Sequence, residues 1–299
     1  FCNMPEIAIH NELISIIIPY YNGASYIEET LHSILQQNNV NFEIILIDDG
    51  STDDTKSNVL SINESRIHYH YQNNSGVSKA RNEGLKLAKG EYLVFFDADD
   101  KMEPHFLDSR LSFLKENENV DFVCGEVVKF KNENLLPGYF RGTSANAIHE
   151  ILLYNQEVIT CPSNYLFRKK FLSQNNLNFN ENLSSTADKY FILLCSRYGK
   201  SDISKKSGKL LYRISDTSMS HQLTEKLVLD NAQYYIELIK SELIPAEIKS
   251  QSLSQGYFML FGANWRINNK LAAVTYLLKS FFCAPLVLLK LFFTRLLKN

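Results

Sequence analysis

Short apolar runs and amphipathic stretches alternate along the first hundred residues. Continuous apolar runs cover residues 13–18 and 92–96, shorter strand-like runs cover residues 43–47 and 67–71, and a polar loop follows each of the four. Short runs rich in β-branched and aromatic residues are typical of buried strands. Between the first two runs, residues 27–35 carry apolar side chains at helical spacing. A chain that alternates strands and helices in this way predicts right-handed crossovers and an α/β fold with a mostly parallel sheet.

Local signals predict where some of these elements begin and end. Pro19 is expected to end the first strand, because proline has no N–H for the ladder. Ser25 and Glu28 have the spacing of a capping box before the first helix. Ser51 or Thr52 can cap the helix that follows the second strand.

Three carboxylates follow the fourth apolar run within four positions: Asp97, Asp99 and Asp100. Open α/β sheets bind ligands at the carboxyl ends of their strands. Crowded carboxylates repel one another unless a cation lies among them, and hard oxygen ligands favour Mg²⁺ or Mn²⁺. The alternative is a polar turn that begins the next helix, since aspartate is common in turns and caps.

The loop after the second strand carries a further acidic group. Asp49 lies where a ligand bound at the sheet edge would lie, and its carboxylate can accept from a base N–H or a ribose hydroxyl. We therefore favour ligand contact for Asp49. For Asp53 and Asp54 we favour a turn and a helix cap.

Arg81 follows the third strand, near the start of a predicted helix with a face of small residues. A cation at that end opposes the helix dipole by about 0.3–1 kcal/mol. Pairing with a diphosphate or with a carboxylate of the site would account for it. On the sequence alone, a solvated arginine is an equal alternative.

Composition narrows the class of protein. The chain has 299 residues, enough for one large α/β domain and a smaller appendage, and a net charge of −2. This net charge is close to zero, so the chain lacks the overall positive charge that would indicate a nucleic-acid partner. The five cysteines are scattered without a C-x-x-C pair, so reduced thiols and a cytoplasmic location are expected. The first residues do not have the pattern of a signal segment.

Four segments occur in order and at suitable spacing: residues 15–22 (SIIIPYYN), 48–53 (DDGSTD), 75–82 (SGVSKARN) and 96–100 (FDADD). Together they resemble a family 2 glycosyltransferase of the GT-A fold, a Rossmann-like sheet flanked by helices. Any one of these segments is a weak signal, whereas four in register are specific. They cover about the first third of the chain.

The resemblance implies a nucleotide-sugar donor and a divalent metal, Mg²⁺ or Mn²⁺. Pro19, Tyr21 and Asp49 would line the nucleoside pocket. Arg81 would approach the base or the diphosphate. Asp97 would bind ribose or metal, and Asp99 would ligate the metal on the diphosphate.

The resemblance also extends to the second half of the chain. The family commonly has Glu-Asp before an aromatic-rich helix, and the aspartate acts as general base; here the pair is Ala187-Asp188. Asp188 is therefore the candidate base of an inverting transfer, with a plain helix cap as the alternative. A late histidine of the family helps to bind metal or diphosphate, which makes His221 a metal candidate.

These assignments divide the chain into two regions. Residues 1–222 would form the GT-A catalytic domain, with a nucleotide-sugar-binding half at 13–100 and an acceptor-side half at 101–222. Residues 223–299 would form a helical C-terminal region that ends in a basic apolar tail at 271–299.

The tail, residues 271–299, has four basic residues and no acidic ones. Pro285 and the basic residues interrupt its apolar runs, which are too short for a spanning helix of about 20 residues. We expect a basic amphipathic segment on the inner face of the cell membrane. The alternative is a helix packed against the catalytic domain or a dimer partner.

The sequence thus predicts an inverting, metal-dependent glycosyltransferase. Its donor would be a nucleotide sugar, with UDP as the expected nucleotide. Its acceptor would be a hydroxyl of a glycan or of a lipid-linked molecule, in cell-surface polysaccharide synthesis. A nucleotidyltransferase would usually carry a glycine-rich basic loop after the first strand, where this chain has Tyr20-Tyr21-Asn22-Gly23. A catalytically inactive transferase-like protein that binds a nucleotide or acts as a scaffold is the remaining alternative, and Ala187 is its support.

Overall fold

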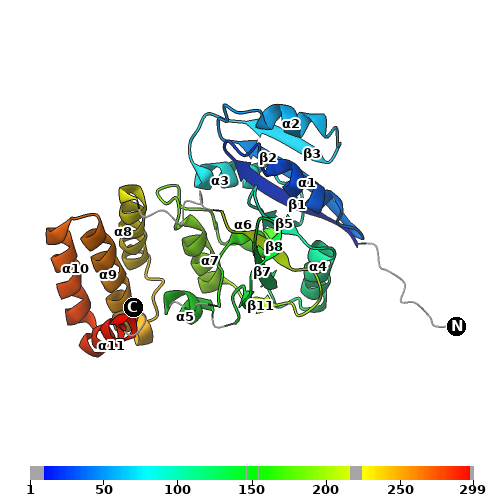
Figure 1. Cartoon of the computed structure of the whole chain (residues 1–299). Helices are drawn as coiled ribbons and strands as arrows, with labels where there is room; N and C mark the ends of the chain where they lie inside the picture. The colour runs from blue at the N-terminus through cyan, green and yellow to red at the C-terminus, as the bar shows by residue number, and fades with distance from the viewer. Residues whose placement is uncertain (1–9, 146, 154, 156, 216–223, 297–299) are drawn as a thin grey trace.

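The structure is a computed structural model that describes residues 10–145, 147–153, 155, 157–215 and 224–296. It is a mixed α/β architecture in which helices flank a large central sheet and further helices follow at one side (Figure 1).

The central sheet has seven strands in the order β11-β6-β10-β4-β1-β2-β3. Their bounds are β1 (His10–Tyr20), β2 (Val40–Asp48), β3 (Ile67–Tyr71), β4 (Tyr92–Phe95), β6 (Phe122–Cys124), β10 (Leu166–Arg168) and β11 (Ser201–Ile203). Every neighbouring pair is parallel except the two pairs made by β10. The predicted α/β class with a mostly parallel sheet is confirmed.

A second, smaller sheet lies beyond the carboxyl end of β4. It consists of β5 (Lys101–Met102), β7 (Glu126–Lys131), β8 (Asn134–Leu135), β9 (Phe140–Arg141) and β12 (Leu210–Arg213). We call residues 97–100, which carry three aspartates, the acidic turn. Since β5 begins directly after Asp100 and pairs with β12, the smaller sheet brings residues from position 210 onward to this turn.

Helices cover both faces of the central sheet. They are α1 (Ile27–Leu35), α2 (Thr55–Ser61), α3 (Val77–Leu87), α4 (Phe106–Glu116), α5 (Ala147–Leu152), α6 (Lys169–Gln174) and α7 (Ala187–Tyr198), with the short 3-10 helix η1 (Pro162–Asn164). Strand β1 shows why its apolar run is continuous: Ile16 and Ile18 belong to one hydrophobic cluster, and Ile17 belongs to the other. Burial on both faces removes the alternation that a half-exposed strand would show.

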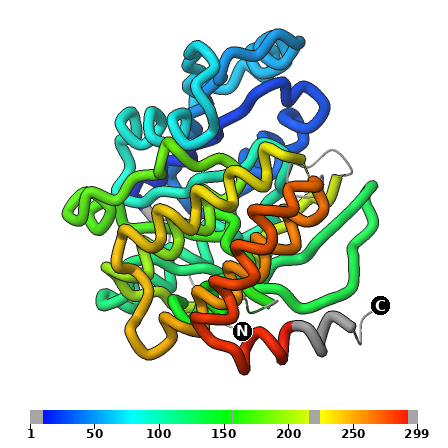
Figure 2. Tube along the Cα trace, turned by 90° about the vertical axis from the view of Figure 1, so that its left-hand side faces the viewer, coloured from blue at the N-terminus to red at the C-terminus, as the bar shows by residue number. Residues whose placement is uncertain are grey.

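The C-terminal region is helical, as predicted. It comprises α8 (Glu225–Lys240), the 3-10 helix η2 (Ala246–Ile248), α9 (Lys249–Arg266), α10 (Lys270–Cys283) and α11 (Pro285–Leu296). These helices pack against one another at one side of the molecule (Figures 1 and 2). Tyr234, Leu238 and Leu260 share a hydrophobic cluster with Phe191 of α7, so this region continues the hydrophobic core beneath the central sheet. Within the described residues, no helix has the length and apolar character needed to cross a bilayer.

The prediction that Pro19 ends the first strand was wrong. β1 continues to Tyr20, and Pro19 pairs with Ile47 of β2. The backbone of Ile17 faces β4, because its carbonyl oxygen accepts from the N–H of Phe96. Backbone groups two residues apart face the same side, so the nitrogen of Pro19 also faces that side, beyond the pairing with β4. The missing N–H therefore removes no ladder hydrogen bond.

The caps predicted at Ser25 and at Ser51 or Thr52 were also wrong, whereas the turn and cap predicted at Asp53 and Asp54 are confirmed, because Asp54 is the N-cap residue of α2. The N-cap of α1 is Tyr26, without a side-chain cap, and the backbone N–H of Tyr26 donates to the carbonyl of Gly23 instead. Helix α2 begins only at Thr55, whose N–H donates to the carboxylate of Asp53 at 3.2 Å. The preceding loop makes tertiary contacts with the end of β1 instead: Asn22 Oδ1 accepts from the N–H of Thr52.

Candidate active site

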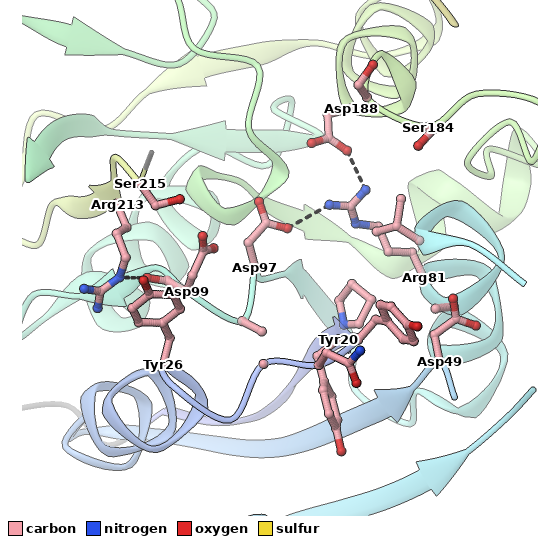
Figure 3. A pocket seen from close by; sticks show the side chains of 18 of the residues that line it. Tyr20, Tyr26, Asp49, Arg81, Asp97, Asp99, Ser184, Asp188, Arg213 and Ser215 are labelled. Carbon is pink, nitrogen blue, oxygen red and sulfur yellow. Dashed lines mark hydrogen bonds and ion pairs between the residues drawn. The ribbon is translucent and has the colours of Figure 1, made fainter. Parts of the chain in front are cut away.

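A pocket of about 540 Å³ opens at the carboxyl ends of β1, β2 and β4 (Figure 3). The described residues that were predicted for the site all contribute to its wall: Pro19, Tyr21, Asp49, Arg81, Asp97, Asp99 and Asp188. His221, the remaining candidate, lies outside the described residues. The pocket brings these side chains together because parallel strands end at the same edge of the sheet.

Neighbouring elements hold the acidic turn after β4 in place. The hydroxyl of Thr30, on α1, lies within hydrogen-bond distance of the carbonyl oxygens of Ala98 (2.9 Å) and Asp100 (2.8 Å). The hydroxyl of Ser163, in η1, accepts from the backbone N–H of Asp97 at 2.9 Å. Hydrogen bonds from two neighbouring elements thus hold the backbone that carries the carboxylates.

Arg81 bridges two carboxylates of the pocket. Its guanidinium donates to Asp97 Oδ1 at 2.7 Å and to Asp188 Oδ1 at 2.5 Å (Figure 3). The arginine side chain is only 3% exposed, whereas those of Asp97 and Asp188 are 26% and 28% exposed. Of the alternatives for Arg81, the structure shows pairing with carboxylates of the site. Its Nε has no hydrogen-bond partner among the described residues.

Burial and mutual repulsion shift the acidity of the carboxyl groups. Burial, and then the charge of Asp97, raise the pKa of Asp99 to about 6. Burial also raises the pKa of Asp188 to about 6, although the Arg81 guanidinium favours the ionised form. Asp100 is almost fully buried, and burial and the two neighbouring aspartates raise its pKa well above the ordinary value.

The same crowding provides a test of whether a divalent cation fits. Asp97, Asp100 and Cys161 place one possible ligand atom each within 4.8 Å of the others. Burial raises the pKa of the Cys161 thiol, which donates to Asp97 Oδ2 at 3.3 Å and is therefore a protonated donor. The carboxylates are hard oxygen ligands whose repulsion a Mg²⁺ or Mn²⁺ ion would relieve. The carboxylates of the turn at residues 97–100 therefore fit such an ion, whereas the protonated thiol of Cys161 does not contribute to this fit.

Asp49 holds the loop that precedes α3. Its Oδ1 accepts from Gln72 Nε2 at 2.7 Å and from the N–H of Ser75 at 2.8 Å, and its Oδ2 accepts from the N–H of Gly76 at 2.8 Å. A carboxylate has about four acceptor positions, so about one remains for a ligand. Asp49 therefore shapes the pocket wall whether or not it also contacts a base.

Helix α3 positions the segment that leads to Asp188. Asn82 donates to the carbonyl of Phe179 at 2.9 Å and accepts from its N–H at 2.9 Å. The hydroxyl of Ser78 donates to the carbonyl of Leu183 at 2.8 Å. Ser78, Arg81 and Asn82 are three and four residues apart, so they lie on one helix face. The third motif of the sequence thus binds a segment about 100 residues away.

Arg213, which was not predicted for the site from the sequence, lines the pocket beside Asp99. Its backbone N–H donates to Asp100 Oδ1 at 3.0 Å, its Nε to the carbonyl of Asp99 at 2.8 Å, and its guanidinium to Glu29 at 2.7 Å. The sequence offered one signal, the pair Tyr212-Arg213 shortly before His221. Only the pairing of β12 with β5 shows that Arg213 lies beside the acidic turn. Further wall residues without an earlier assignment include Tyr26, Ser184, Ser185, Tyr212 and Ser215.

Comparisons with known proteins agree with this arrangement. The sequence profile of the family described as Glycosyl transferase family 2 matches residues 15–175, which is more than half of the chain. The chain belongs to glycosyl transferase family 2. An "uncharacterized glycosyltransferase" of Rickettsia felis is 33% identical over 284 residues, which cover 92% of this chain and 42% of the relative. The chain therefore spans less than half the length of this relative.

A second relative has both a described activity and solved structures. The poly(ribitol-phosphate) β-N-acetylglucosaminyltransferase TarS of Staphylococcus aureus is 27% identical over 250 residues, covering 81% of this chain and 42% of TarS. A crystal structure of S. aureus TarS in complex with UDP-GlcNAc superposes with a TM-score of 0.68 at 22% identity, and covers 90% of this chain and 79% of that one. This likeness shows that the two chains share the GT-A fold.

Proposed function

We propose that this family 2 member is an inverting, metal-dependent glycosyltransferase that moves a sugar from a UDP-linked donor to an acceptor hydroxyl. One observation carries the proposal: an acidic turn and a separate aspartate line one pocket, and a buried arginine joins them. The donor side would be the wall formed by Pro19, Tyr21 and Asp49. The structure of TarS with UDP-GlcNAc supports a UDP-sugar as the donor.

Asp97 and Asp99 would hold the divalent cation beside the donor diphosphate. When bound, such a cation stabilises the negative charge that develops on the leaving nucleoside diphosphate. Arg81, whose side chain is only 3% exposed, would act on the donor site through the two carboxylates with which it pairs, Asp97 and Asp188. His221 remains a proposed contributor from the part of the chain that is not described.

Asp188 would act as the general base. Its carboxylate would take the proton from the acceptor hydroxyl as that oxygen forms a bond to the anomeric carbon, and the bond from this carbon to the diphosphate oxygen breaks on the opposite face. A base works best when its pKa lies near the working pH, and a pKa of about 6 leaves Asp188 ionised at pH 7. The attack from the opposite face gives inversion.

Ligand-dependent melting tests the donor assignment. UDP-GlcNAc with Mn²⁺ is expected to raise the melting temperature, because a ligand at 100 times its Kd adds about 2.7 kcal/mol to the free energy of unfolding. GDP-mannose with Mn²⁺, and UDP-GlcNAc with EDTA, are the matched controls and should give smaller shifts. An equal response to both nucleotides would contradict a UDP-selective pocket. Binding without UDP release across a broad acceptor panel would favour the inactive, transferase-like alternative.

We further propose that α10 and α11 contact an anionic membrane surface, where a lipid-linked or glycan acceptor would be met. Exposed apolar side chains recur on α10 at spacings of three and four residues, and they continue on α11: Leu271, Val274, Leu278, Phe281, Phe282, Leu286 and Leu289. Lys270, Lys279 and Lys290 accompany them, and no acidic residue occurs in either helix. Basic residues beside an apolar helix face are typical of interfacial helices.

Vesicle flotation tests this surface. The protein should float with vesicles that contain phosphatidylglycerol and much less with pure phosphatidylcholine, because about 1 kcal/mol per basic residue comes from the surface potential. The double variant Phe282→Glu, Leu286→Glu should lose most of this binding, since each side chain is 80% exposed. Leu229→Glu, at an exposed position on α8, is the matched control. Concentration-dependent dimers without flotation would instead assign the face to a second copy of the chain.

A further inference from the structure

The segment that leads into Asp188 is held from a second side, by a carboxylate of the C-terminal helical region. Asp230, on α8, accepts four hydrogen bonds from three consecutive residues. They come from the N–H of Ser184 (2.7 Å), the hydroxyl of Ser185 (2.6 Å), and the N–H and hydroxyl of Thr186 (both 2.9 Å). Hydrogen bonds to an ionised acceptor are about twice as strong as those between neutral groups.

The position of these contacts matters because the next helix carries the candidate base. Thr186 is the N-cap of α7, and its own side chain does not cap that helix. Asp230 satisfies the N–H of Thr186 and places a negative charge beside the N-terminus of α7, where the helix dipole favours it. Ser184 and Ser185 themselves line the pocket. The carboxylate therefore holds a part of the pocket wall and the start of the helix of Asp188.

We propose that Asp230 is a positioning residue for Asp188, so that helix α8 is a working part of the active site. The inference rests on the proposed function, in which Asp188 is the base. Arg81, on α3, orients the carboxylate of Asp188. Asp230, on α8, holds the backbone at the start of α7, the helix that carries Asp188. A misplacement of about 1 Å in a reacting group can lower a rate by about 100-fold.

The test separates positioning of the base from donor binding. In Asp230→Ala, the kcat for UDP-GlcNAc hydrolysis or transfer is expected to fall by about 10- to 100-fold. The Kd for UDP with Mn²⁺, measured by calorimetry, should stay within about twofold, because the donor wall keeps its contacts with α1 and α3. Hydrogen exchange at residues 184–188 should accelerate, and exchange within α3 should not. Asp230→Asn keeps one acceptor oxygen and should fall between Asp230→Ala and the wild type. Glu225→Gln, which removes an exposed charge from the same helix, is the control.

Two results would overturn the inference. One is a wild-type kcat in Asp230→Ala, and the other is a parallel loss of kcat and of UDP affinity in a folded variant, which would show that Asp230 supports the whole pocket and not the base in particular. If Asp230→Ala does not fold, Asp230→Asn carries the same comparison.

Asp188→Asn distinguishes this inference from the proposed function. If Asp188→Asn keeps its activity, the assignment of the base fails and takes the positioning role with it. If Asp188→Asn is inactive while Asp230→Ala has wild-type kcat and exchange, only the positioning role fails.

Discussion

Asp188→Asn is expected to lower the rate of sugar transfer by about 100- to 10,000-fold, the usual contribution of a general base. The amide matches the carboxylate in size but cannot accept the acceptor's proton. Arg81 keeps its second partner, Asp97, in the variant, so the pocket should still bind UDP with Mn²⁺. Single-turnover release of UDP measures the chemical step, and calorimetry measures the binding. Asp54→Asn, at an exposed position, is the control for a lost charge.

The pH profile gives the same residue a second test. Burial raises the pKa of Asp188 to about 6, so the protonated, inactive form accumulates as the pH falls below that value. The rate of the wild type should therefore fall about tenfold for each pH unit below about 6. Saturating Mn²⁺ keeps the nearby Asp99 ionised, because a cation favours the charged form. An unchanged rate in Asp188→Asn, or a flat profile down to pH 5, would rule out Asp188 as the base.

Asp99→Asn is expected to abolish most of the Mn²⁺-dependent affinity for UDP and to lower transfer by at least about 100-fold. A metal ion supplies several kcal/mol of charge stabilisation in such reactions, and each 1.36 kcal/mol corresponds to a factor of ten. The amide is a weaker ligand for a hard cation than the carboxylate that it replaces. Titration of UDP with and without Mn²⁺ checks the affinity, and UDP release checks the rate. Metal-dependent binding of wild-type strength would contradict the role of Asp99.

The melting temperature of this variant tests whether a loss of activity comes from unfolding. Burial and the charge of Asp97 raise the folded-state pKa of Asp99 to about 6, so its ionisation above that pH opposes folding. The cost is absent below the ordinary pKa of 3.8, grows between that value and about 6, and is complete above pH 6. Without metal, Asp99→Asn should therefore melt at or above the temperature of the wild type at pH 8, and this advantage should shrink toward pH 5. A variant that is less stable at pH 8 would contradict the crowding of carboxylates.

Two features of the site show how far sequence patterns reach. Asp97 and Asp99 were assigned to the site because a strand buried on both faces has a visible apolar run, and the position after such a strand in a parallel sheet is predictable. Arg213 was not assigned, because its contacts with Asp99 and Asp100 depend on the pairing of two short strands, β5 and β12. Strands of only two and four residues leave no periodic signal from which a pairing could be inferred.

The sequence by itself determined where the buried strands lie along the chain, the α/β class and the loops that carry the acidic residues, because burial and strand ends are local properties of a chain. Only the tertiary structure decided that Arg81 joins Asp97 to Asp188, although Asp188 lies 107 residues after Arg81 in the sequence. It also decided that Asp230 supports the start of the helix that carries Asp188. It also decided that Pro19 continues its strand, since the missing N–H faces a side without a partner. These contacts join separate elements, and their geometry depends on how those elements pack.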